Sequence, residues 1–242
     1  MKPILLVPMA GKGQRFINKG YTTPKQFLDV GGHTMIEWSF KSFDWEDCDI
    51  VFIIRRDENY DVESHLKKIF GDDIKIVVTD ELTDGTVSSC LLAKEYIDKD
   101  VPLGITTLDV FFQPKFLLNK MSNDIDGCLL TIETDNPGYS YSEVVNGYVV
   151  RTAEKKVISK YGNVGYYYFN KGSEFVKYAE KMIENNIRTN GEFYVAPLYN
   201  LFIEDGAKIT TIPIDKQYHM GTPEEMDYFK SQQMKDIIDE VW

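Results

Sequence analysis

The sequence predicts one α/β domain built on a mixed, mostly parallel sheet that is flanked by helices. Short apolar runs alternate with amphipathic segments along most of the chain, which is typical of β-α-β units. An Asn-Gly pair inside a later strand-like run predicts an added antiparallel hairpin. The 242 residues contain no internal repeat, low-complexity tract or Pro/Ser-rich linker, and they suffice for one domain with a sizeable core.

The first half of the chain contains strand-like runs separated by helix-like segments. The expected strands are apolar runs at 2–8, 49–55, 74–78, 102–112 and 127–133. The expected helices carry their apolar residues on one side and span 34–43, 59–70 and 86–97. Binding sites of parallel sheets lie beyond the carboxyl ends of the strands. The loop at 8–20 and Asp109, which lies near the end of the fourth run, are therefore expected to converge.

The regular alternation of strand-like and helix-like segments ends after about residue 136. A hairpin is expected over 144–151, with its turn at Asn146-Gly147. Further strands are expected at 163–169 and 207–214, and helices at 173–183, 193–204 and 223–240, the last with Pro223 at its start. This half is expected to extend the same sheet and to add a wall to the site, so residues 1–242 are expected to form a single domain.

Composition and charge exclude several classes of function. The formal net charge is −11 and the isoelectric point is about 4.8, which argues against a nucleic-acid partner and against a membrane-surface role. No apolar run approaches the length of a membrane span, and a cytoplasmic protein is expected. Cys48, Cys90 and Cys128 are scattered without zinc-site spacing, so buried free thiols are expected.

The stretch "VPMAGKGQRF" predicts a loop that binds an anion. Residues 1–28 hold five cations and no acid, although the remaining residues carry 22 cations against 38 acids. Gly11 and Gly13 allow the backbone to approach a phosphate closely. Phe16 stands where a dinucleotide-binding loop needs a third glycine, and the Gly-Lys-Ser/Thr pattern of a Walker loop is absent. Arg15 offers a planar fork to a polyphosphate, and Lys25 offers a compact charge.

The sequence resembles the nucleotidyltransferases that include the sugar-phosphate nucleotidyltransferases. The resemblance begins with "VPMAGKGQRF...PKQFLDVGGHTMIEW" and continues through "DGTVSS", "LDVFF", "AEKKVISKYGNVGYYYF", "NGEFYVAPLYN" and "HMGTPEE". It implies a Rossmann-like nucleotidyltransferase fold with a nucleotide-binding half at 1–135 and an acceptor-binding half at 136–242. It also implies that a phosphorylated acceptor attacks the α-phosphate of an NTP and releases pyrophosphate, in the branch often found in bacterial capsule and surface-glycan pathways.

The resemblance also implies roles for individual residues. Arg15 would hold the leaving pyrophosphate, Lys25 would neutralise the α-phosphate or the attacking phosphate, and Asp109 would hold Mg²⁺. The nucleotide-binding residues would be Met9, Ala10, Gly11, Gly13, Gly85, Thr86 and Ser89. The acceptor-binding residues would be Glu154, Lys155, Gly165, Glu192 and His219.

Several of these positions have a structural interpretation as well. Gly85 could admit a flat base or simply form the turn before a helix that starts at Thr86. The run 190–193 could support the acceptor pocket or cap the helix that follows. His219 stands where sugar-1-phosphate thymidylyl- and uridylyltransferases generally place a second metal-binding Asp, so it is expected beside Asp109, contacting a phosphate, a water or the acceptor, or else filling a turn.

The substrates stay open on the sequence alone. A pyrimidine NTP, either CTP or UTP/dTTP, is predicted as the donor. The acceptor could be a sugar phosphate, or a phosphocholine-like or phospho-amino-acid compound in a cytidylyltransferase. The motif "PKQFL" also prompts a comparison with the cytidylyltransferases of the isoprenoid pathway. A non-catalytic nucleotide-sensing protein is the alternative from another class, and a homo-oligomer is compatible with each of these functions.

Overall fold

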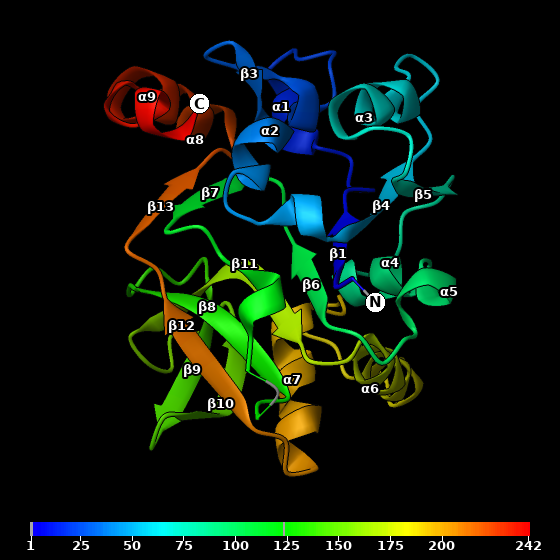
Figure 1. Ribbon diagram of the computed structural model, residues 1–242, viewed down its shortest axis with the longest axis vertical. Helices are drawn as coiled ribbons and strands as arrows, with labels where there is room; N and C mark the ends of the chain where they lie inside the picture. The colour runs from blue at the N-terminus through cyan, green and yellow to red at the C-terminus, as the bar shows by residue number, and fades with distance from the viewer. Residues whose placement is uncertain (1, 123) are drawn as a thin grey trace.

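A nine-stranded sheet runs through the part of the chain that the structure, a computed structural model, describes, namely residues 2–122 and 124–242. Its main path has the order β10-β9-β11-β6-β1-β4-β5; β8 pairs with β11, and β12 pairs with β8 (Figure 1). The strands are paired in parallel in one half and mainly antiparallel in the other. The sheet is therefore mixed, with a parallel nucleus.

Four strands form the parallel nucleus, and each lies within or next to a run expected from the sequence. They are β1 (Ile4–Pro8), β4 (Asp49–Arg55), β5 (Lys75–Thr79) and β6 (Leu103–Thr106). The side chains of β1 alternate between the two faces of the sheet. Leu5 and Val7 belong to one buried apolar cluster, and Ile4 and Leu6 belong to another, as the two-residue period of a strand requires.

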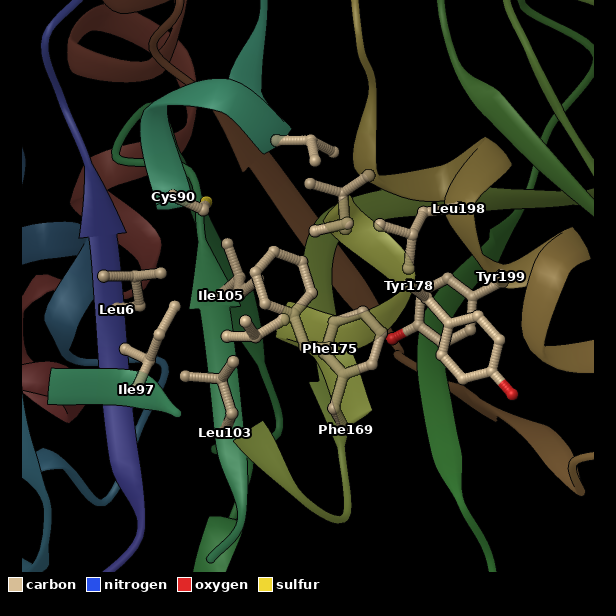
Figure 2. Packing of buried hydrophobic residues seen from close by; sticks show 14 of the residues in the cluster. Leu6, Cys90, Ile97, Leu103, Ile105, Phe169, Phe175, Tyr178, Leu198 and Tyr199 are labelled. Carbon is tan, nitrogen blue, oxygen red and sulfur yellow. The ribbon is translucent and has the colours of Figure 1, made fainter. Parts of the chain in front are cut away.

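Helices cover both faces. One face packs against α2 (Met35–Phe40) and α3 (Val62–Phe70). The other packs against α4 (Thr86–Leu91), α5 (Lys94–Ile97), α6 (Gly172–Glu184) and α7 (Val195–Glu204). Figure 2 shows the cluster on this face, in which Leu6 of β1 lies next to Ile97 of α5 and Ile105 of β6 lies next to Phe175 of α6. The helix expected over 86–97 is interrupted between α4 and α5.

The second half extends the same sheet, as expected. It adds β9 (Ser140–Val145), β10 (Tyr148–Glu154), β11 (Tyr161–Phe169) and β12 (Ile209–Pro213). β8 (Gly127–Glu133), from the end of the first half, pairs with β11 and β12. β11 pairs antiparallel with β6 and joins the two halves. The β9–β10 hairpin turns at Asn146 and Gly147, whose φ angles are 52° and 84°, so the hairpin prediction is confirmed.

The run at 102–112, which was expected to be one strand, is two strands in different sheets. β6 ends at Thr106, and β7 (Val110–Gln113) pairs instead with β13 (Lys216–His219). The β6–β11 pairing continues as far as the hydrogen bond from the Thr107 N–H to the carbonyl of Gly165, a residue of β11 with a φ of 78°. The ladder turns away at that point, and Asp109 is left in the loop between the two strands.

The C-terminal helices pack against helices from the N-terminal part of the chain. The segment expected to be one helix over 223–240 contains α8 (Pro223–Tyr228) and α9 (Ile238–Val241), separated by tighter and wider turns. These helices lie beside α1 (Gln14–Asn18) and α2, close to the short strands β2 (Asp29–Val30) and β3 (His33–Thr34) (Figure 1). Phe229 and Ile237 pack there against Trp38 in a third apolar cluster.

The cysteine prediction is confirmed, since Cys48, Cys90 and Cys128 are all free and buried. Among the described residues, no helix is both long enough and apolar enough to cross a membrane.

Candidate functional site

The glycine-rich loop leaves the carboxyl end of β1 and lies against the neighbouring strand. Its first residue is fixed by a hydrogen bond of 2.8 Å from the Met9 N–H to the carbonyl oxygen of Ile53 in β4. Gly13 has a φ of 64°, a conformation in which α1 can begin at the next residue. A small cavity of about 90 Å³ lies over this loop, and Met9, Gly11, Gly13 and Lys25 are among the residues that line it.

An ion pair connects this loop region to Asp109. The Lys25 ammonium lies 3.0 Å from Oδ2 of Asp109, and the two side chains are 28% and 29% exposed. Burial would raise the pKa of Asp109, but the charge and hydrogen bond of Lys25, with a hydrogen bond from Thr107, hold this pKa below its ordinary value. The carboxylate is therefore ionised at neutral pH.

The C-terminal segment "HMGTP" lies directly beside Asp109. The Met220 N–H donates a hydrogen bond of 2.8 Å to the Asp109 carbonyl. A Cβ added at Gly221 would lie 3.0 Å from Oδ2 of Asp109, so the glycine leaves space next to the carboxylate. The placement of this segment beside Asp109 agrees with the sequence analysis.

A cleft of about 440 Å³ opens on the other side of Asp109. It gathers predicted residues from both halves of the chain, namely Arg15, Thr86, Asp109, Glu154, Gly165 and His219. Arg15 lines this cleft and not the small cavity over the glycine-rich loop. The side chain of Ala10 lines neither space and is buried in the apolar cluster around β1, so only its backbone is available to a nucleotide.

The need for a glycine at position 85 follows from the close approach of the Phe193 backbone. The φ of Gly85 is 128°, and a Cβ there would lie 2.5 Å from the backbone nitrogen of Phe193. This close approach is fixed by two backbone hydrogen bonds, from the Phe193 N–H to Asp84 and from the Val87 N–H to Phe193. Ser89 does not line the cleft. Its hydroxyl oxygen lies 2.5 Å from that of Thr83.

Glu154 is another carboxyl group that lines the cleft. It ends β10 and is half-buried. Burial raises its pKa to about 7; the Lys155 charge partly opposes this increase, and the Glu192 charge adds to it. Lys155 donates a hydrogen bond of 3.0 Å to the Tyr194 hydroxyl. Glu192 is exposed in the turn before α7, and its side chain does not line the cleft.

His219 forms a pair with a residue that the sequence analysis did not select. Its Nε2 lies 2.5 Å from the hydroxyl oxygen of Tyr139, in the wall of the cleft. Other residues of this wall were also missed, namely Asn136, Ser140, Asn163, Tyr167, Tyr194 and Gln217. They lie on β9, β11 and β13, in the loop before β9 and directly before α7. Asn163, Tyr167 and Tyr194 stand inside motifs quoted for the family resemblance, but nothing in those motifs distinguishes them from their neighbours.

The donor set suits a Mg²⁺ ion that is shared with a phosphorylated ligand. Within residues 2–122 and 124–242, no group of three or more His, Cys, Asp or Glu side chains could enclose a metal. Mg²⁺ is commonly held by one or two carboxylates, together with phosphate oxygens and water. Asp109 fits this role because its carboxylate is ionised and partly exposed, and because Gly221 leaves room beside it.

Comparisons with known proteins identify a family and several similar structures. The family model described as "Nucleotidyl transferase" matches residues 2–196. The bifunctional protein GlmU of Methanococcus aeolicus is 29% identical over 128 residues, which are 53% of this chain and 29% of that protein. The chain thus matches less than a third of the length of this relative.

Solved structures resemble the chain over nearly its whole length. A nucleoside-diphosphate-sugar pyrophosphorylase from Vibrio cholerae RC9 has a TM-score of 0.84 and 27% identity, covering 94% of this chain and 100% of that one. The inositol-1-phosphate CTP transferase from T. maritima has a TM-score of 0.77 and 14% identity, covering 99% and 96%. At 14% identity, the likeness to this CTP transferase concerns the fold alone.

Proposed function

The chain belongs to the nucleotidyl transferase family, and we propose that it transfers a nucleotidyl group from an NTP to a phosphorylated small molecule, with release of pyrophosphate. The observation that carries this proposal is the ion pair between Lys25 and Asp109. It lies between the glycine-rich loop, which suits the phosphates of a nucleotide, and the cleft, which suits an acceptor.

The chain's own residues would act by positioning and by neutralising charge. An oxygen of the acceptor phosphate forms a bond to the α-phosphorus, while the bond from that phosphorus to the leaving pyrophosphate breaks. Lys25 places a positive charge at this point, and Arg15 offers its planar guanidinium from the cleft side. Asp109 would hold Mg²⁺, which supplies charge neutralisation on the phosphates when it is bound.

The acceptor that we propose first is a sugar phosphate. Glu154 and the uncharged polar side chains of the cleft can form hydrogen bonds with hydroxyl groups, and Lys155 carries a positive charge near the rim. A pyrimidine NTP is the proposed donor, and precursor synthesis for a bacterial capsule or surface glycan is the proposed pathway.

A second acceptor class has one observation in its favour. Tyr139, Tyr167 and Tyr194 line the same cleft as Glu154. Aromatic faces together with a carboxylate recognise ammonium groups. A cytidylyltransferase that acts on a phosphocholine-like compound is therefore the second candidate function.

A matrix of nucleotides and acceptors tests these proposals. CTP, UTP, dTTP, ATP and GTP are each incubated with Mg²⁺ and with glucose 1-phosphate, phosphocholine or phosphoserine, and pyrophosphate release is measured. We expect one pyrimidine nucleotide with one acceptor to exceed the background without acceptor, and Asp109→Asn to abolish this signal. Nucleotide binding without pyrophosphate release would instead support a sensor, and a preference for ATP or GTP would refute the proposed donor.

A further inference from the structure

Arg55 is a cation of the small cavity that the family resemblance does not assign. We propose that Arg55 binds the terminal phosphates of the nucleotide and neutralises the leaving pyrophosphate. This inference rests on the proposed function, because it names a further residue of the same site. The sequence analysis predicted this role for Arg15, but the side chain of Arg15 lines the cleft and not the small cavity.

The position of Arg55 follows from the sheet. It is the last residue of β4, the strand that pairs in parallel with β1. The carboxyl ends of both strands therefore meet at one edge, where the glycine-rich loop begins. Arg55 lines the cavity of about 90 Å³ together with Gly11, Lys12, Gly13 and Lys25.

The guanidinium lacks the partners that such a group normally has. Its Nε atom is buried and has no hydrogen-bond partner, and Arg55 forms no ion pair within the described part of the chain. The next residue, Arg56, is exposed and lies 2.7 Å from a carboxylate oxygen of Asp80. A buried donor without a partner costs free energy. An anion in the cavity would offset this cost.

The charges around the cavity favour an anion. Among the described residues that line it, Lys12, Lys25 and Arg55 are cations and Asp57 is the one acid. Asp57 is exposed and accepts a hydrogen bond of 2.9 Å from the Asn59 N–H. This local excess of positive charge contrasts with the formal net charge of −11 for the chain, and a guanidinium fork suits phosphate oxygens.

The position of Lys25, between the small cavity and Asp109 of the cleft, indicates which class of ligand would reach Arg55. Lys25 lines the small cavity and also forms the ion pair with Asp109 at the cleft. A polyphosphate whose reacting phosphorus lies near Asp109 can thus extend its terminal phosphates towards Arg55. When the bond from the α-phosphorus to the bridging oxygen breaks, the pyrophosphate retains that oxygen and its charge, which Arg55 balances.

Calorimetric titration with inorganic pyrophosphate tests the proposal without requiring turnover. We expect Arg55→Gln to weaken pyrophosphate binding by at least about tenfold and Arg55→Lys to weaken it less, because Lys keeps the charge without the fork. Arg56→Gln is the matched control and should bind as the wild type does. Asp57→Asn removes a negative charge from the cavity and should strengthen binding, which keeps the test decisive if Arg55→Gln does not fold.

A second readout separates contact with the terminal phosphates from a general structural effect. The affinity for the nucleoside monophosphate should be the same in Arg55→Gln and the wild type, whereas the affinity for the triphosphate should fall. Unchanged pyrophosphate binding in Arg55→Gln, an equal loss in Arg56→Gln, or no pyrophosphate binding by the wild type would overturn the proposal. Failure of the proposed function would appear separately, as absence of turnover in the matrix.

Discussion

Replacing Glu154 with glutamine should make the protein more stable at alkaline pH and leave it nearly unaffected at acidic pH. Burial raises the pKa of this carboxyl from the ordinary 4.5 to about 7 in the folded protein. Between these two values the folded state binds the proton more tightly than the unfolded state does. The free energy of unfolding contributed by Glu154 therefore falls as pH rises through this window.

The size of the effect follows from the same two values. One pKa unit corresponds to 1.36 kcal/mol, so the interval from 4.5 to about 7 sets an upper limit of about 3 kcal/mol. Relaxation and water penetration at a half-buried side chain reduce this limit, and we expect about 1–3 kcal/mol. The glutamine side chain has the same shape as Glu154 without the charge, so the variant should gain this amount relative to the wild type above about pH 8.

Urea unfolding followed by circular dichroism at about pH 5 and about pH 8 measures the difference. Glu184→Gln is the matched control, since Glu184 is exposed on α6, and its effect should be the same at both pH values. The reasoning would be refuted if the difference between Glu154→Gln and the wild type did not grow with pH.

Three further substitutions test individual contacts of the site. Lys25→Ala should lower kcat/KM by about 10²–10³-fold because it removes charge stabilisation at the reacting phosphate, while the melting temperature changes little; unchanged turnover would exclude the role. His219→Ala should reduce activity less than Asp109→Asn and leave Mg²⁺ as the required ion. An equal loss of Mg²⁺ binding in the two variants, measured by calorimetry, would show that the histidine is itself a metal ligand. Gly85→Ala should lower the free energy of unfolding by about 2–4 kcal/mol, because its Cβ would lie 2.5 Å from the Phe193 backbone at a φ of 128°; a wild-type melting temperature would contradict this geometry.

Local sequence patterns predict most elements of the fold, because strand and helix periods are properties of short segments. These patterns fail where pairing with a segment far away in the sequence determines where a strand ends. The run 102–112 is apolar apart from Thr106, Thr107 and Asp109, yet it forms two strands, because β6 pairs with β11 and β7 pairs with the distant β13. Helix α1 was missed because Gly-Lys-Gly reads as a loop, although Gly13 in fact precedes the helix in a left-handed conformation.

Some residues of the candidate site could likewise be predicted from the sequence, and others could be identified only from the fold. Asp109 and the glycine-rich loop could be selected because they follow strands whose ends meet at one edge. Arg55 and Arg56 are indistinguishable in the run "RRDE", and only the structure separates the unpartnered guanidinium in a cavity from the exposed one paired with Asp80. Tyr139 also required the fold, since it is 80 residues away from His219 in the sequence.

Product analysis tests the central claim of nucleotidyl transfer most directly. The wild type is incubated with Mg²⁺, the acceptor selected by the matrix and its NTP, and the products are separated and identified by ³¹P NMR and mass spectrometry. We predict equal amounts of pyrophosphate and of a product in which the α-phosphate of the nucleotide is joined to the acceptor phosphate, and neither product with Asp109→Asn. Release of inorganic phosphate with a nucleoside diphosphate, or an acceptor that gains the terminal phosphate instead, would contradict the account.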